Sequence, residues 1–207
     1  MARDLKQENN RGIFLIMSAS LVLSAFLQFE FSSLSGLADV FLVGSGGLIL
    51  SALFVLLANL LPQNIKHKLI FTRYKNELPG CRADQLCKKD SRIEYDIVSQ
   101  RWPEVFTEGI DGSTRNSRWY QQIYKHVKDS QEVSQAHRNF LLYRDAFSGL
   151  FLILLTTISY SFLGASKFVV EIKPVVFLAQ GLLTILSLIA ARVAGNRLVI
   201  NAVVAAE

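Results

Sequence analysis

Four blocks of apolar residues constrain this chain more than any other feature of its sequence. They lie at about residues 12–31, 37–61, 146–163 and 174–191, and none has a charged residue near its centre. A helix rises about 1.5 Å per residue, so a block of about 20 residues crosses the ~30 Å hydrocarbon core of a bilayer. The sequence therefore predicts an all-α integral membrane protein with four transmembrane helices.

The four blocks are expected to form two hairpins, 12–61 and 146–191, because only short connectors separate the members of each pair. Between the hairpins lies a polar, helical insert, 62–145, and the ends form a leader, 1–11, and a tail, 192–207. The tail ends in a mildly apolar run that could lie on the membrane or pack on the insert. A cleaved signal peptide is the competing interpretation of the first block, but a second apolar block follows it directly.

The distribution of positive charge predicts the orientation. The leader, insert and tail together hold 20 of the 22 Lys and Arg residues, whereas the two connectors hold the other 2. Loops rich in Lys and Arg stay on the cytoplasmic side. Both termini and residues 62–145 are therefore predicted to be cytoplasmic, and the expected location is a bacterial inner membrane.

The insert shows helical patterns of its own. Residues 83–102 have apolar positions at helical spacing and are followed by Pro103, so one helix is expected there, and a loop over 107–116. Asn116 or Ser117 is predicted to cap a next helix, whose apolar stripe is Tyr120, Ile123, Tyr124 and Val127. Asp129 and Ser130 give a second cap signal, and from Gln131 the helical pattern continues without a stop to Leu163.

No motif predicts an enzyme. The chain has no Walker A loop, GxGxxG, HExxH, GxSxG or paired CxxC motif, so neither a catalytic residue nor a cofactor is predicted. Cys81 and Cys87 could join a histidine around zinc, but structural zinc sites use tighter spacing. Two reduced cytosolic thiols are the favoured interpretation.

A basic, aromatic stretch at residues 115–147 carries the predicted ligand site. Cations next to stackable rings suit a nucleotide or a single nucleic-acid strand, because the cations attract phosphate and the rings offer a flat face to bases. In the alternative, the rings belong to a core and the cations are solvated or face lipid headgroups. The predicted ligand-binding residues are Arg115, Arg118, Trp119, Tyr120, Lys125 and Lys128.

Weakly polar residues follow single faces of the first and fourth blocks. Such faces either join helices by hydrogen bonds or line a water-filled path. The predicted pore-lining residues are Ser20 and Ser24 in the first block and Gln180, Thr184 and Ser187 in the fourth. The absence of a central ionisable residue argues against a proton pump or an ion-coupled transporter.

The span layout, the basic insert and the stretch RWP…STRNSRWYQQIYKHVKDSQEVSQAHRNFLLYRDAF together resemble the small membrane effectors of bacterial anti-phage nucleotide-signalling systems. The chain is similar to the membrane effector of the Hailong defence system. That resemblance implies an oligomeric channel whose cytosolic part binds a short DNA oligomer made by a partner nucleotidyltransferase. The oligomer would hold the channel shut, and its loss during infection would open it. No residue roles are carried over.

The expected function is therefore a homo-oligomeric membrane channel gated by an anionic nucleotide or oligonucleotide. The alternative is a non-conducting membrane anchor that recruits a cytosolic protein partner. The two hypotheses differ in one simple observation, because a channel depolarises the cells that express it and an anchor does not.

Overall fold

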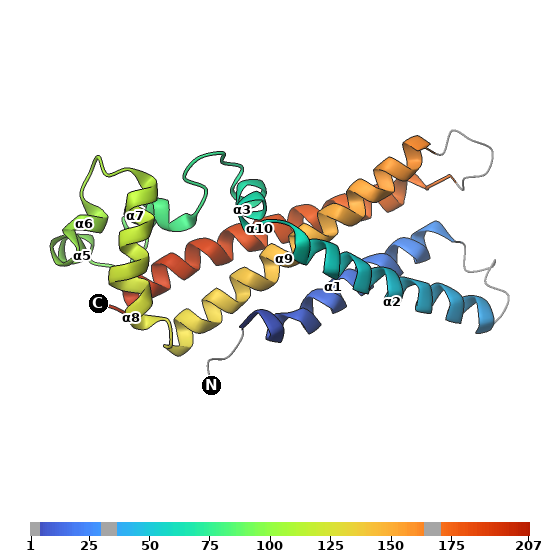
Figure 1. The fold of residues 1–207 in the computed structure, drawn as a ribbon, viewed down its shortest axis with the longest axis horizontal. Helices are drawn as coiled ribbons and strands as arrows, with labels where there is room; N and C mark the ends of the chain where they lie inside the picture. The colour runs from blue at the N-terminus through green and yellow to red at the C-terminus, as the bar shows by residue number, and fades with distance from the viewer. Residues whose placement is uncertain (1–4, 30–36, 164–170) are drawn as a thin grey trace. The chain divides into compact units, whose positions relative to one another are not determined.

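The computed structural model describes the backbone of residues 5–29, 37–163 and 171–207, and the side chains of residues 9–29, 45–162 and 171–207 (Figure 1). Most of these residues are helical, and none of them belongs to a β-strand. This confirms the predicted all-α class. The two predicted hairpin connectors lie largely outside the described residues.

The chain divides into two compact units. Unit 1 comprises Met1–Pro62 and Leu142–Ile189, and unit 2 comprises Gln63–Leu141 and Ala190–Glu207. Two long helices, α9 (Gln131–Leu163) and α10 (Pro174–Val204), each contribute residues to both units. The start and end of α9 are those that the cap signal and the apolar pattern predict.

Unit 1 consists of α1 (Leu5–Gln28), α2 (Leu37–Leu60), residues 142–163 of α9 and residues 174–189 of α10. Its core is apolar and brings together Ile13, Met17, Phe54, Ala58, Leu150 and Ile153. Gly149 of α9 leaves room for the side chain of Met17 on α1, since a Cβ there would overlap Met17 Cε.

Large apolar side chains also cover the outside of unit 1. Examples are Leu15, Ile49, Leu60, Phe162 and Leu178, all of which are exposed. Water disfavours such a surface, whereas lipid chains suit it. Three segments are long and apolar enough to cross a membrane: Asn9–Gln28, Gln131–Phe162 and Pro174–Val204.

The predicted second span, 37–61, is present as helix α2, which ends before Pro62. In the part of α2 whose side chains are described, Ser45–Leu60 forms a bent pair with α3 (Gln63–Phe71), and the described residues hold four candidate spans only if this pair is counted as one. The bend follows from Pro62, which cannot continue a helix interior. Helix α2 is unbroken at Gly46 and Gly47, and a Cβ at either position would meet nothing within 4 Å among the described residues.

Unit 2 contains short helices where the sequence pattern predicts one long helix. Instead of a helix over 83–102, the chain forms α4 (Ala83–Cys87) and α5 (Tyr95–Arg101). Asp90 causes the break, because its carboxylate accepts hydrogen bonds from the Arg92 backbone N–H at 3.1 Å and from Arg92 Nε at 2.9 Å. Such local bonds from an Asp side chain compete with the helix ladder. A 3₁₀ turn, η2 (Pro79–Arg82), precedes α4, and α6 (Pro103–Phe106) follows α5.

The next helix begins earlier than predicted. Asp111 caps α7 (Gly112–Trp119), accepting hydrogen bonds from the backbone N–H groups of Ser113 and Thr114, so the predicted cap at Asn116 or Ser117 is wrong. Helix α7 continues through a π-helical turn, η3 (Tyr120–Tyr124), into α8 (Lys125–Val127). A π turn holds an extra residue and rotates the residues after it about the helix axis. Within this turn Ile123 and Tyr124 are buried, whereas Tyr120 is half exposed.

The tail is helical and packs on the insert. Helix α10 continues to Val204, beyond the predicted end of the fourth span at residue 191. Within unit 2, Arg92 donates to Asn201 Oδ1, and Arg101 donates to the Glu207 carbonyl at 2.8 Å. Of the two predicted positions for the tail, the structure has the one packed on the insert.

Cys81 and Cys87 are both buried and free. Burial raises the pKa of the Cys81 thiol and raises the pKa of Cys87 to about 12. The reactive thiolate is therefore scarce at neutral pH, and both residues act as small core side chains. No group of three or more His, Cys, Asp or Glu side chains among the described residues is placed to hold a metal ion.

Candidate ligand-sensing site

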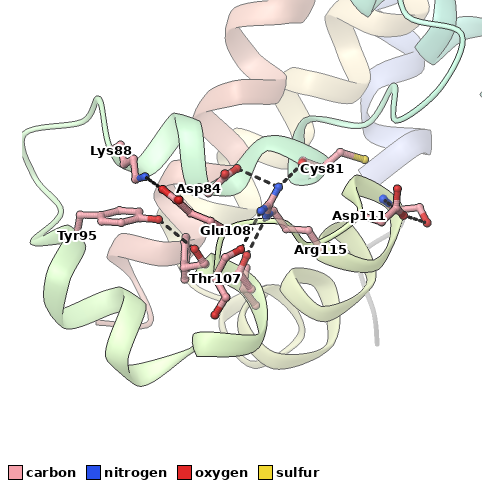
Figure 2. Close-up of polar contacts among 11 residues, drawn as sticks. Cys81, Asp84, Lys88, Tyr95, Thr107, Glu108, Asp111 and Arg115 are labelled. Carbon is pink, nitrogen blue, oxygen red and sulfur yellow. Dashed lines mark hydrogen bonds and ion pairs between the residues drawn. The ribbon is translucent and has the colours of Figure 1, made fainter.

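Arg115 is the most deeply buried of the predicted ligand-binding cations. The residue is 7% exposed, and its guanidinium donates to the backbone carbonyls of Val105 at 2.9 Å and Thr107 at 3.1 Å. Nη1 also donates to the Cys81 carbonyl and lies 3.3 Å from Asp84 Oδ1 (Figure 2). One planar group thus joins η2, α4, α6 and the loop after α6.

These contacts assign Arg115 a structural role. A guanidinium has five N–H donors in a fixed fork, and here the fork is directed at groups of unit 2 itself. The sequence marks Arg115 as a cation next to aromatic rings but does not show that the charge is buried. The N–H groups of Arg115 are therefore engaged within unit 2 and are not available to a ligand.

Trp119 and Tyr120 differ in their access to solvent. Trp119 is 6% exposed and Tyr120 is 50% exposed, although both contact Tyr124, with ring-centroid distances of 5.5 and 5.3 Å. Gly80 makes the burial of Trp119 possible, because a Cβ at that position would lie 2.9 Å from Trp119 Cε3. Of the predicted aromatic pair, only Tyr120 offers a ring face to a ligand in solution.

The π-helical turn borders an aromatic cavity of about 160 Å³ in unit 2. Trp119, Tyr120, Tyr124, His137 and Phe140 contribute to its wall. Tyr124 Oη and His137 Nδ1 are joined by a hydrogen bond of 2.7 Å, whose direction depends on the histidine tautomer. Burial raises the pKa of Tyr124, so the phenol is neutral at pH 7. π-helical turns are frequent at functional sites.

The other three predicted cations are more accessible. Lys125 and Lys128 are exposed, whereas Arg118 is partly buried and donates to the Glu104 carbonyl at 3.0 Å. Arg118 Nε also lies 3.8 Å from the Glu104 carboxylate, with both side chains substantially exposed. Such an exposed ion pair is weak, so an anionic ligand can displace it. The predicted set thus separates into a buried pair, Arg115 and Trp119, and an accessible group.

The predicted pore-lining residues of unit 1 face one another within a single chain. Gln180 Nε2 donates to Ser24 Oγ at 3.0 Å, and Ser24 Oγ donates to the Ser20 carbonyl at 2.8 Å. Thr184 and Ser187 bond to carbonyls of their own helix. Ser20, Ser24, Gln180 and Thr184 are buried, and the Gln180–Ser24 hydrogen bond joins α10 to α1 in this structure. Their pore-lining role stays a prediction for a conformation in which these helices have separated.

One buried charged pair is not among the residues that the sequence predicts for a site. Arg144 and Asp145 lie in the α9 part of unit 1, 4% and 2% exposed, and the guanidinium donates to both carboxylate oxygens at 3.1 and 3.0 Å. Buried charges are retained only when paired. The signal available in the sequence is the position of the Arg-Asp pair immediately before the third apolar block.

No protein-family model matches the chain, and neither a curated protein nor a solved structure shows significant similarity to it.

Proposed function

We propose that this chain is the subunit of a homo-oligomeric membrane channel gated by an anionic nucleotide or oligonucleotide that binds unit 2. In this proposal the channel lies in a bacterial inner membrane, has four spans per subunit and acts in anti-phage defence. The signal is a short oligonucleotide or nucleotide supplied by a partner nucleotidyltransferase.

One observation carries the proposal: α9 is a single helix of 33 residues that starts in the polar unit and ends in the apolar unit. Its residues 131–141 belong to unit 2, and its residues 142–163 belong to unit 1. A continuous helix moves as a stiff rod, because each turn is hydrogen-bonded to the next. A displacement of its first turns in unit 2 therefore reaches the apolar segment.

The accessible side chains near the start of this helix suit an anionic ligand. Lys125 and Lys128 are exposed, and Tyr120, which precedes Lys125 by five residues, is 50% exposed. Cations bind phosphate groups, and an exposed ring stacks on a base. The excess of Lys and Arg outside the two connectors supports the placement of this surface in the cytoplasm.

Gating requires the ligand to bind two conformations with different affinity, since equal affinity shifts no equilibrium. In the proposed mechanism, ligand held by Arg118, Lys125 and Lys128 fixes one position of the first turns of α9. Release of the ligand frees the helix, and the Ser24–Gln180 contact between α1 and α10 then opens. The polar faces of these helices thereby become available to water.

Charge reversal tests the ligand surface. The double variant Arg118→Glu, Lys125→Glu is expected to weaken binding of a short DNA oligonucleotide at least tenfold, because two attractive interactions become repulsive. The salt dependence should also fall, by a slope of about 0.7 for each phosphate group that the variant no longer binds. Fluorescence anisotropy on the purified chain in nanodiscs measures both quantities, and growth of expressing cells shows the effect on toxicity.

Lys89→Glu is the matched control, because Lys89 is also exposed in unit 2 but lies outside the proposed surface. It should leave affinity and growth unchanged. Equal oligonucleotide affinity of the wild-type chain and the double variant, with both inserted in the membrane, would exclude this ligand surface.

The second candidate is a non-conducting anchor, and the polar contacts of unit 1 favour it. Ser20, Ser24, Gln180 and Thr184 are buried in packing between helices, as expected of a static helical bundle. Membrane potential in expressing cells separates the two functions. A channel depolarises the cells, whereas an anchor leaves the potential unchanged.

A further inference from the structure

Three arginines outside the predicted ligand-binding set line one cavity of unit 2. The cavity has a volume of about 410 Å³ and is lined by Phe71, Thr72, Arg73, Arg82, Arg192 and Asn196. Arg73 follows α3, Arg82 ends η2, and Arg192 lies on α10. The volume is in the range of small-molecule binding pockets.

Two hydrogen bonds from Arg192 fix the wall of the cavity next to it. Arg192 Nε donates to the Ile70 carbonyl, and Nη2 donates to Thr72 Oγ1 at 3.1 Å. Thr72 has a φ of 49°, in the left-handed region that a β-branched residue rarely adopts. Backbone strain of this kind is concentrated at binding sites and switch regions.

Arg82 is fixed differently. Its guanidinium lies over the Phe71 ring, with Cζ 5.6 Å from the centroid. Its Nε is buried and has no hydrogen-bond partner among the described residues, and the same holds for Asn196 Oδ1. Burial and the nearby charge of Arg73 lower the pKa of Arg82.

The charges of this cavity are unbalanced. Its described lining contains three guanidinium groups and no Asp or Glu. Like charges in a partly desolvated space repel one another, and a buried N–H without a partner costs further free energy. An anion in the cavity removes both penalties. Phosphate suits it best, because arginine N–H groups match phosphate oxygens in pairs.

We propose that the cavity bounded by Arg73, Arg82 and Arg192 binds a phosphate group, carried by a free nucleotide or oligonucleotide or by a lipid headgroup. Arg73 and Arg82 supply the N–H donors directed at phosphate oxygens. Asn196 adds its amide NH₂ after a half-turn about its terminal torsion. Arg192 orders the Thr72 wall and contributes its charge.

The site deepens the proposed function, and its regulatory meaning rests on that function. Arg192 and Asn196 both lie on α10, whose residues 174–189 belong to the apolar unit 1. A phosphate bound to these side chains therefore contacts the same helix that supplies residues 174–189 to the apolar unit. The binding site itself does not depend on the channel hypothesis.

Calorimetry with inorganic pyrophosphate tests the site, on the intact chain in nanodiscs of phosphatidylcholine alone. Arg82→Gln and Arg73→Gln should each weaken binding at least tenfold, and Arg82→Lys should recover part of the affinity because it restores the charge. Lys89→Gln is the control and should bind like the wild-type chain. Arg192 is left intact because its guanidinium also holds the Ile70 carbonyl. Failure of the wild-type chain to bind pyrophosphate, or equal affinity in folded Arg82→Gln, would overturn the proposal.

A second set of nanodiscs, containing phosphatidic acid, separates the two sources of phosphate. Competition with pyrophosphate that disappears in Arg82→Gln assigns the site to a lipid headgroup, whereas no competition assigns it to a soluble phosphate. Ion flux measured on the same samples keeps the two hypotheses apart. Arg82-dependent binding without flux retains the site and rejects the channel. Ligand-dependent flux without Arg82-dependent binding rejects the site alone.

Discussion

Arg115→Ala is expected to destabilise unit 2 by about 3–5 kcal/mol, the usual cost of removing one partner from a buried ion pair. The substitution leaves Asp84 without its ion-pair partner and removes the donor from the carbonyls of Val105 and Thr107. A buried acceptor without a partner carries its full desolvation cost. Arg115→Lys should recover little, because one ammonium group cannot reach carbonyls on separate segments.

Tryptophan fluorescence during chemical unfolding measures this effect selectively. The chain has two tryptophans, Trp102 and Trp119, and both belong to unit 2. Lys128→Ala provides the control, since Lys128 is exposed and its removal should change the free energy of unfolding by less than about 0.5 kcal/mol. An Arg115→Ala midpoint equal to that of the wild-type chain would show that the guanidinium does not hold unit 2 together.

Leu141→Pro is expected to abolish ligand-dependent gating while oligonucleotide binding continues. Residue 141 is the last residue of the first stretch of unit 2, and α9 passes through it into unit 1. Proline removes the N–H that donates to the carbonyl four residues earlier, and its ring clashes with the same carbonyl. The resulting kink costs about 3 kcal/mol and interrupts the rod that links the two units.

Leu141→Ala serves as the control, because alanine preserves the helix and removes only side-chain packing. Anisotropy with the oligonucleotide reports binding, and ion flux from liposomes reports gating. Coupling through α9 predicts that Leu141→Pro loses only the second response and that Leu141→Ala keeps both. A Leu141→Pro chain whose flux still follows the ligand would exclude α9 as the link.

The membrane-type helices could be predicted from sequence because their signals are local. Apolar length, Pro174 and the Asp129–Ser130 cap signal lie within or next to the helices that they define, and α9 and the start of α10 appear where predicted. Local signals do not give the number of spans in the same way. At Pro62 the pattern predicts where α2 ends, but it does not predict whether Ser45–Leu60 and α3 form one bent span or two separate helices.

The interior of unit 2 could not be predicted from such signals. The Asp90–Arg92 bonds follow α4 and interrupt a pattern that predicts one long helix, and the Asp111 cap starts α7 within the predicted loop 107–116. Arg115 shows a larger obstacle, because its role depends on carbonyls from separate parts of the chain. No spacing rule predicts such carbonyl contacts.

The three-arginine cavity illustrates the same point for a binding site. Arg73 and Arg82 lie in the insert after the second apolar block, and Arg192 follows the fourth apolar block more than a hundred residues later. Only folding brings them to one cavity. In the predicted basic and aromatic stretch, by contrast, residues close together in the sequence do not share one environment. Arg115 is buried, whereas Arg118 is only partly buried.

Single-channel recording from the purified chain in planar bilayers tests the central claim most directly. A ligand-gated channel predicts discrete current steps whose open probability changes when a short DNA oligonucleotide is added on the unit 2 side. The Arg118→Glu, Lys125→Glu variant should conduct but lose this response. Inserted wild-type protein that gives no current steps would contradict the account.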